Sequence, residues 1–533
     1  MAALESLVSR KTLAGALSGA LLVFCFPRPS LHLLAWVALV PVLWIVSEGR
    51  PRTAAKAGAA AGLFFHTGNL HWISQVMVEY GGLGRGMSLV VLFVLIGYLS
   101  AFFCAFAGLA AAACKRWGAR SLFLAPLFWV GFEIFRNYPF GGFPWCLLGY
   151  SQVSALPVYQ IASITGVYGV SFLLVLVNAT WVYVLRTSGL KPRLRAAVPV
   201  AALVAAVLAF GWKELGRSLP RPGLRVAAVQ GNVHQEEKWK PELASEIFSR
   251  HMALSASAAA QGARLVVWPE SSTPFNFDRT PALANAMRAF ARQTQVYLFF
   301  GSDDYEYPDP RKPDDYRVYN GAKLLDPEGE LTFRYHKMHL VPFGEYVPLS
   351  KVFFFAKNLT QEVGGFSPGT EVKVGRLDGG SIGAFICYEA IYPDLIRRFA
   401  VEGGGLFVQL TNDAWFGTSW APYQHFSMAV ARAVENRRYL LRAANTGISA
   451  VVDPYGRITV RKELLEQGVL VADVDFRTEL TPYARRGDLL AWLGAVVTLA
   501  FGASVLSSRF AAKRSPQPNA SGVGPRRSWR RRP

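Results

Sequence analysis

Residues 381–389 read Ser-Ile-Gly-Ala-Phe-Ile-Cys-Tyr-Glu, an apolar run that ends on a thiol and an acid. A short apolar run of this kind predicts a buried strand, which places Cys387 at the strand end. Cys387 is also the only cysteine between residues 223 and 483. No disulfide can form within this block, so Cys387 is either inert packing or a thiol kept free for chemistry.

The block around Cys387 alternates short apolar runs with helical stretches. Besides 381–387, strands are expected at 225–230, 264–268, 296–301, 406–411, 448–453 and 469–473. Helices are expected at 241–260, 281–293, 391–400 and 423–443. This alternation predicts a layered α/β domain with its chemistry at the carboxyl ends of strands.

Three expected strands end on the residue types that acyl transfer requires. Residues 265–270 (Leu-Val-Val-Trp-Pro-Glu) place Glu270 after one strand, Lys337 follows residues 331–333, and Cys387 follows 381–386. A base, an ammonium partner for an oxyanion and a nucleophile are therefore present. A Cys-His arrangement that uses His336 or His339 is the alternative, but it leaves Glu270 and Lys337 unexplained.

The rest of the chain is membrane-like. Of 533 residues, 52% are hydrophobic and only 17% are charged, which is too apolar for a wholly soluble protein. Eight apolar segments are expected to span a bilayer: 13–26, 31–46, 57–73, 87–113, 121–135, 158–185, 196–212 and 489–507. The first two are short and could instead form a re-entrant hairpin. The first segment lacks a small-x-small cleavage pattern, so we expect an anchor rather than a cleaved signal peptide.

Lysine and arginine cluster before the first expected span and in every second turn after it. The basic groups are Arg10 and Lys11; Arg50, Arg52 and Lys56; Lys115, Arg116 and Arg120; and Arg186, Lys191, Arg193 and Arg195. Because basic short loops stay cytoplasmic, the amino terminus is expected inside and the α/β block outside. The expected divisions are 1–222 with seven spans, 223–483, a last span in 484–508, and a basic cytoplasmic tail, 509–533. We interpret that tail as a topology anchor near anionic lipid rather than a nucleic-acid-binding segment.

The motifs resemble a known superfamily. Glu270 in Trp-Pro-Glu, Lys337 in residues 337–348 (Lys-Met-His-Leu-Val-Pro-Phe-Gly-Glu-Tyr-Val-Pro) and Cys387 in Ile-Cys-Tyr-Glu match the Glu-Lys-Cys triad of the nitrilase, or carbon-nitrogen hydrolase, superfamily. With residues 141–145 (Gly-Gly-Phe-Pro-Trp), 411–417 (Thr-Asn-Asp-Ala-Trp-Phe-Gly) and the flanking spans, the whole chain resembles bacterial apolipoprotein N-acyltransferases.

This resemblance implies a nitrilase-like αββα sandwich inserted between helical spans, in the inner membrane and facing the periplasm. Cys387 would take an acyl chain from a phospholipid as a thioester and pass it to the α-amine of a diacylglyceryl-cysteine in an apolipoprotein. The resemblance also implies catalytic support by Glu345, Tyr388 and Glu389. Three further positions, Trp239, Trp415 and Arg438, match ones tied to substrate binding or activity. Phe416, beside Trp415, is expected to bind substrate as part of an aromatic mouth.

Each triad member has a physical reason to be present. A thiol with a pKa of about 8.5 is mostly protonated at neutral pH, so Glu270 must accept its proton. Lys337 and the backbone N–H of Tyr388 could then stabilise the oxyanion. The incoming amine attacks only when neutral, so Glu270 is needed a second time.

Two further features point to lipid. Trp239, Trp415 and the stretch Phe353-Phe354-Phe355 could form an apolar mouth at the membrane surface, although the phenylalanines could equally be core. Glu133 and Arg136, three residues apart near the outer end of the expected span 121–135, could contact a head group or pair to hold helices in register.

No metal or organic cofactor is expected, because the histidine and cysteine spacings and the glycine-rich segments match no such site. The expected partners are the phospholipid donor, the apolipoprotein acceptor and membrane lipids, with no nucleic acid and a monomeric chain. One alternative is a membrane-tethered amidase or nitrilase of the same superfamily. The other is a transporter with a ligand-binding outer domain, which would place charges or broken helices at mid-membrane.

Overall fold

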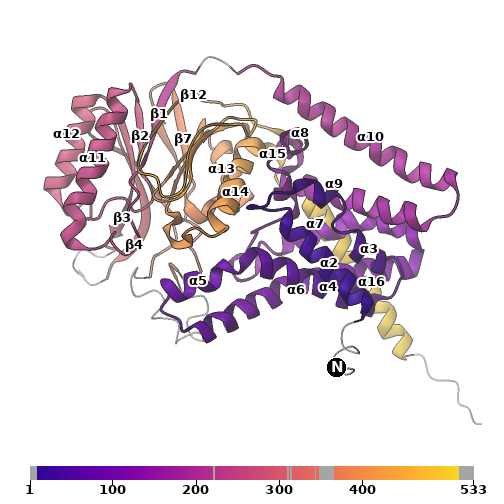
Figure 1. Ribbon diagram of the computed structural model, residues 1–533. Helices are drawn as coiled ribbons and strands as arrows, with labels where there is room; N and C mark the ends of the chain where they lie inside the picture. The colour runs from indigo at the N-terminus through magenta and orange to yellow at the C-terminus, as the bar shows by residue number, and fades with distance from the viewer. Residues whose placement is uncertain are drawn as a thin grey trace, which may run out of the picture.

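The computed structural model describes residues 9–219, 222–308, 311, 315–342, 344–346 and 365–514. The chain has a helical half and an α/β half that lie against one another (Figure 1). The expected aromatic segment 353–355 and the end of the basic tail lie outside the described residues.

The helical half is built from apolar helices of unequal length. Four helices in the described part of the chain are long and apolar enough to cross a membrane: α6 (Arg85–Trp117), α9 (Ala162–Arg186), α10 (Leu190–Leu215) and Leu489–Ser508 of α16 (Leu489–Arg514). The others are α2 (Arg10–Phe24), η1 (His32–Trp36), α3 (Val40–Val46), α4 (Pro51–Leu70), α5 (Trp72–Glu79), η2 (Ala119–Leu124), α7 (Ala125–Phe135), η3 (Pro139–Gly141), η4 (Leu148–Gln152) and α8 (Leu156–Tyr159). The chain is therefore a membrane protein.

Several expected spans are broken or short. The segment expected at 31–46 is divided into η1 and α3, and the one expected at 121–135 is divided into η2 and α7. With 15 residues, α2 measures about 22 Å at 1.5 Å per residue, less than the roughly 30 Å of a bilayer core. Periodicity alone could not reveal these interruptions.

The α/β half contains two mixed sheets. Among the described residues, the first sheet has the order β12-β1-β2-β3-β4-β5 and the second the order β11-β10-β9-β8-β7-β6. The first is formed by β1 (Leu224–Gln230), β2 (Leu265–Val267), β3 (Tyr297–Glu306), β4 (Arg317–Leu325), β5 (Leu331–His336) and β12 (Gly468–Val474). The second is formed by β6 (Val374–Leu377), β7 (Gly380–Ile386), β8 (Leu406–Thr411), β9 (Tyr439–Ala444), β10 (Ser449–Val452) and β11 (Ile458–Lys462).

Both sheets share one plan. The strands β1, β2 and β3 are parallel, as are β7, β8 and β9, and antiparallel strands extend each trio on both sides. Parallel strands end at one edge of their sheet, so the loops after β7 and β8 meet at one edge of the second sheet. The Asn412 N–H, after β8, donates from there to Glu270, which follows β2 of the first sheet.

Side chains alternate between two cores along the first sheet. Val226 and Val267 face the second sheet, whereas Ala227 and Val266 pack under the helices α11 (Ala244–Ala260) and α12 (Pro281–Thr294). The helices α13 (Pro393–Val401) and α14 (Ala421–Asn436) cover the second sheet on the side of the membrane helices (Figure 1). The layers are therefore α, β, β and α, as expected for an αββα sandwich.

The expected helix at 423–443 is wrong in its second part. Helix α14 ends at Asn436, Arg437 adopts a left-handed φ of 53°, and Tyr439–Ala444 form the fully buried strand β9. A strand buried on both faces does not alternate apolar and polar residues, so the apolar residues of β9 were predicted as a continuation of the helix. The expected strands at 225–230, 264–268, 296–301, 381–387, 406–411, 448–453 and 469–473 coincide with β1, β2, β3, β7, β8, β10 and β12 within a few residues.

Candidate active site

The nucleophile candidate follows directly after β7. Cys387 opens the short helix η7 (Cys387–Ile391) with a left-handed φ of 49°, a conformation that costs about 1–3 kcal/mol for a non-glycine residue. Its carbonyl oxygen accepts hydrogen bonds from His425 Nε2 at 2.9 Å and Gln409 Nε2 at 3.1 Å. The side chain is 6% exposed. The thiol is thus held at a strained turn rather than packed within the strand.

Two acids surround the lysine. Lys337 follows β5, and its Nζ lies 2.9 Å from Glu270 Oε1 and 2.9 Å from Glu345 Oε1. All three side chains are buried. Glu345 Oε2 also accepts from the Val341 N–H at 2.8 Å, which anchors the short segment that carries it. Glu270, Lys337 and Glu345 therefore form one hydrogen-bonded cluster.

Two asparagines orient the carboxylates. Asn320 of β4 donates its amide to Glu270 Oε1 and to Glu345 Oε1, both at 2.8 Å. The backbone N–H of Asn412, after β8, donates to Glu270 Oε2 at 2.9 Å. Glu270 is thereby fixed by one donor from within β4 and one from the loop after β8.

Burial and charge set the protonation states of the cluster. Burial alone would raise the pKa of Glu270, but the ammonium groups of Lys337 and Lys238 and two side-chain hydrogen bonds hold that pKa below its usual range. Burial opposes the charge on Lys337, yet Glu270 and Glu345 raise its pKa well above normal. The pKa of Cys387 is raised, first by burial and then by the Glu270 charge, while Lys337 opposes this shift. The resting site therefore holds a thiol beside an ionised base.

Glu389 joins the loop of the thiol to the loop of the lysine. Its Oε2 accepts from the Ile386 N–H at 2.7 Å, and its Oε1 accepts from the Met338 N–H and the Tyr335 hydroxyl, each at 2.7 Å. Tyr388 is buried, and its ring lies 5.5 Å from that of Tyr392. Glu389 thus fixes Cys387 relative to Lys337.

Two of the expected substrate-binding aromatics contact the helical half. The ring of Trp415 meets Tyr80 edge-on at 5.1 Å, and that of Phe416 meets Trp72 edge-on at 5.0 Å. Trp239 is 44% exposed and follows the buried Lys238. The loop after β8 therefore lies at the junction of the two halves.

Arg438 lies apart from the other predicted site residues. Its guanidinium donates to the backbone carbonyls of Gly404 at 2.8 Å, Asn436 at 3.0 Å and Glu479 at 2.7 Å. The side chain is fully buried. In this arrangement Arg438 ties the start of β9 to neighbouring loops.

The two histidines of the Cys-His alternative are engaged elsewhere. His336 Nε2 lies 2.9 Å from Asp304 Oδ2, and the His339 ring stacks on Tyr392 at 4.0 Å. Among the described side chains, no group of three or more histidines, cysteines or acids could hold a metal ion.

Three buried polar residues at the site were not predicted from the sequence. Asn320 lies in the unpredicted β4, Lys238 donates to the Glu270 carbonyl at 3.0 Å, and His425 contacts the Cys387 carbonyl. Their functions depend on burial and strand register, which a single sequence does not display. Asn412 could have been predicted as a site residue, because it directly follows the expected strand 406–411.

Two protein families match parts of this chain. Residues 225–483 match the carbon-nitrogen hydrolase family, and residues 18–180 match the apolipoprotein N-acyltransferase N-terminal domain. The chain is 40% identical over 508 residues to the apolipoprotein N-acyltransferase of Geobacter metallireducens, covering 93% of this chain and 96% of that protein. The chain belongs to the apolipoprotein N-acyltransferase family.

Similarity extends to further relatives. The apolipoprotein N-acyltransferase of Pseudomonas syringae is 34% identical over 477 residues, covering 87% of this chain and 90% of that protein. A nitrilase-superfamily amidase from Nesterenkonia is 22% identical, with a TM-score of 0.39, over 51% of this chain and 98% of the amidase. The family match and the curated relatives make the chain an acyltransferase, and its residues 225–483 match the carbon-nitrogen hydrolase family.

Proposed function

We propose that this chain transfers an acyl chain from a phospholipid, through a thioester on Cys387, to the α-amine of the diacylglyceryl-cysteine of an apolipoprotein. The product is the triacylated lipoprotein. The observation that carries the proposal is the cluster in which Lys337 Nζ lies 2.9 Å from both Glu270 and Glu345, in the same site as a thiol at a strained strand end. Family membership supplies the donor and acceptor classes.

In the first half-reaction the Cys387 sulfur attacks the ester carbonyl carbon of the phospholipid. Glu270 takes the thiol proton, because the raised pKa of Cys387 leaves few thiolates at neutral pH. The tetrahedral oxyanion is stabilised by Lys337 and by the backbone N–H of Tyr388. The ester C–O bond then breaks, Glu270 returns its proton to the leaving hydroxyl, and lysophospholipid departs.

In the second half-reaction the neutral α-amine of the lipoprotein attacks the thioester carbon. Glu270 collects the amine proton, the C–S bond breaks, and the same proton restores the Cys387 thiol. Glu345 keeps Lys337 in place through both steps, and Glu389 keeps Cys387 and Lys337 in register. One base thereby serves both transfers.

Lipid reaches this site from the helical half. The contacts of Trp415 with Tyr80 and of Phe416 with Trp72 support an aromatic mouth at the junction, with Trp239 on its exposed side. We assign Arg438 an indirect part in substrate binding, because its guanidinium holds backbone rather than open space.

The scaffold has eight spans in this proposal, seven within 1–222 and one within 484–508. The domain 223–483 faces the periplasm from the inner membrane, with the basic segment 509–533 in the cytoplasm and the chain acting as a monomer. The alternating basic turns support this orientation. Short helices such as α2 and α3 must then cross with neighbouring turns, as interrupted spans buried in protein can.

The test is direct observation of the acyl intermediate. Purified protein is incubated with phospholipid carrying a labelled acyl chain, and mass spectrometry looks for a thioester on Cys387. A diacylated lipopeptide is then added, and the label is expected on its amine. An adduct released only as free fatty acid would show a hydrolase, and no adduct would overturn the proposal. Cys387→Ser is expected to abolish the thioester, and Glu345→Ala to abolish activity without unfolding the domain.

A further inference from the structure

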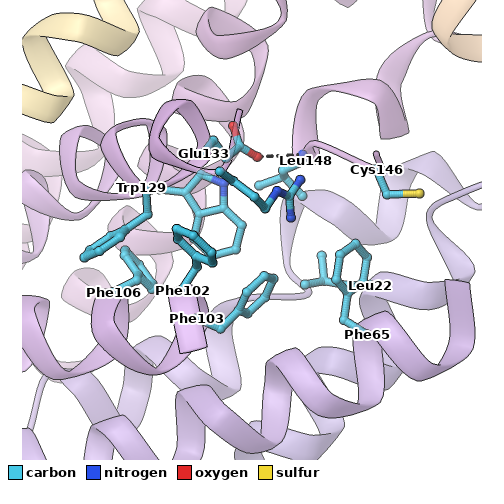
Figure 2. A pocket seen from close by; sticks show the side chains of 11 residues that line it. Leu22, Phe65, Phe102, Phe103, Phe106, Trp129, Glu133, Cys146 and Leu148 are labelled. Atoms are coloured by element: carbon cyan, nitrogen blue, oxygen red, sulfur yellow. Dashed lines mark hydrogen bonds between the residues drawn. The ribbon is translucent and has the colours of Figure 1, made fainter. Parts of the chain in front are cut away.

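A loop of the helical half is held by two buried charges. Glu133 of α7 and Arg136, directly after that helix, are both buried, and among the described residues each hydrogen-bonds to the loop 145–148 rather than to the other. Glu133 Oε1 accepts from the Leu148 N–H at 2.7 Å, and an Arg136 N–H donates to the Trp145 carbonyl at 3.0 Å. Figure 2 shows Glu133, Leu148 and Cys146 around the same pocket. The loop 145–148 is therefore fixed by helix α7.

Trp145 of that loop reaches across to the α/β half. Its Nε1–H donates to Gln424 Oε1 at 2.8 Å, and its ring stacks on that of His425 at 6.0 Å with 25° between the planes. Gln424 also donates to Asn69 Oδ1 of α4 at 3.2 Å. The first turn of α14 is thus joined to the helical half just where it approaches the nucleophile.

His425 then contacts the nucleophile's own backbone. Its Nε2 lies 2.9 Å from the Cys387 carbonyl oxygen and its Nδ1 lies 2.9 Å from Asp413 Oδ1, with the ring fully enclosed. Arg442 donates to Asp413 Oδ2 at 2.6 Å. Burial would raise the pKa of Asp413, but Arg442 and His425 lower it to about 2, so Asp413 is ionised. The His425 ring is thereby held between the Cys387 carbonyl and the Asp413 carboxylate.

We propose that His425 is a positioning residue that holds Cys387 in its attacking conformation, and that Trp145 of the helical half sets the His425 ring. A carbonyl has two lone pairs, and His425 and Gln409 occupy both at Cys387. The left-handed φ of 49° at Cys387 persists only while neighbours hold it. The helical half therefore contributes to the geometry of the nucleophile as well as to membrane anchoring.

This inference is tested by two measurements. The rate of thioester formation rests on the proposed function, whereas the alkylation of Cys387 does not. The rate of thioester formation from labelled phospholipid is compared among wild type, His425→Phe and His425→Gln. His425→Phe keeps a ring against Trp145 and removes both ring nitrogens, whereas His425→Gln can still donate to the Cys387 carbonyl. His425→Phe is expected to lower kcat about 100-fold with KM unchanged, the loss typical of a misplacement of about 1 Å. His425→Gln is expected to recover to within about tenfold of wild type.

The second readout is alkylation of Cys387 by iodoacetamide, followed by peptide mass spectrometry, which needs no lipid. It should slow in His425→Phe and recover in His425→Gln. Trp145→Leu should slow both readouts, while Trp145→Phe, which keeps an aromatic ring, should stay nearer wild type. Unchanged melting temperatures exclude unfolding as the cause. Equal rates in wild type and His425→Phe, or a His425→Gln variant no faster than His425→Phe, would overturn the inference. If the alkylation rates of wild type and variants follow the expected order but wild type forms no thioester, only the proposed function is overturned.

Discussion

Glu270 lies near two ammonium groups, and only that of Lys337 was predicted from the sequence to belong to the site. Besides Lys337, the buried Lys238 donates to the Glu270 carbonyl oxygen at 3.0 Å, and its charge helps to lower the pKa of Glu270. Burial lowers the pKa of Lys238 itself to about 8, with Glu270 opposing the shift. Lys238 is therefore charged in the acidic range, where Glu270 takes up its proton.

Lys238→Met is expected to move the acidic limb of the pH-rate profile to higher pH. Removing a neighbouring positive charge raises the pKa of a carboxyl, and Glu270 must be ionised to accept the thiol proton. The measurement is kcat/KM for thioester formation between pH 4 and 8. Lys240→Met, an exposed position two residues later, serves as the control and should leave the limb in place. A limb that moves to lower pH in Lys238→Met would contradict this electrostatic account.

The site residues that could be predicted from the sequence are those that directly follow an expected strand. Glu270, Lys337 and Cys387 each follow an apolar strand, so their convergence at one edge could be expected. Asn320 and His425 lie on a strand and a helix face that converge on the site only through tertiary packing. No spacing in a single sequence marks such positions.

At the scale of elements, amphipathic helices and strands with continuous apolar runs were predictable, and strands interrupted by polar residues were not. Helices α11 and α12 and strands β7 and β8 lie within a few residues of their expected positions. Strands β4 and β11 were missed because polar residues interrupt their apolar runs, the buried Asn320 and Lys323 in β4 and Arg461 in β11. The breaks in the membrane helices were not predicted either, because hydropathy shows that a run is apolar but not whether it forms one continuous helix.

Strand β3 supports the catalytic loop through a glycine. A Cβ added at Gly301 would lie 2.5 Å from the Pro269 oxygen, 2.5 Å from the Ser271 nitrogen and 2.7 Å from the Glu270 Cα. Backbone atoms cannot yield as a flexible side chain can, so Gly301→Ala must displace Glu270. We expect thioester formation to fall about 100-fold, because a shift near 1 Å at a reacting group costs about that much.

The comparison for Gly301→Ala is Gly97→Ala, on the open side of α6, where an added Cβ meets nothing within 4 Å. That variant should keep wild-type activity. Crystallographic or cryo-EM coordinates of Gly301→Ala should show Glu270 moved from Lys337. Wild-type rates in Gly301→Ala would mean that the loop after β2 adapts without cost.

For the whole molecule, the two halves are joined by buried polar contacts as well as by aromatic rings. Arg432 of α14 donates to the Tyr150 hydroxyl of η4 at 2.7 Å and to Glu435 Oε1 at 3.1 Å, with both charged side chains fully enclosed. Burial raises the pKa of Glu435 to about 7, and Arg432 opposes the shift. Such contacts make the α/β half dependent on the helical half for satisfied polar groups.

Arg432→Met is expected to destabilise the protein by about 3–5 kcal/mol near pH 8, because it leaves Glu435 buried without its partner. Without Arg432 the pKa of Glu435 rises further. Its protonated form is then favoured in the folded state, so the deficit is relieved as pH falls and is largest above the raised pKa. Thermal unfolding in detergent at pH 5.5 and pH 8 should therefore show the smaller loss at pH 5.5.

Tyr150→Phe separates the junction from the ion pair, because it removes only the hydrogen bond between the two halves. That bond involves a charged donor, so a loss of about 1.5–3 kcal/mol with little pH dependence is expected. Arg461→Met removes a partly exposed pair with Glu463 and should cost about 1 kcal/mol or less. If Tyr150→Phe and Arg461→Met melted at the wild-type temperature alike, the Arg432–Tyr150 contact would not hold the halves together. Other contacts at the junction would then do so, such as the Trp145–Gln424 hydrogen bond and the Phe416–Trp72 ring contact.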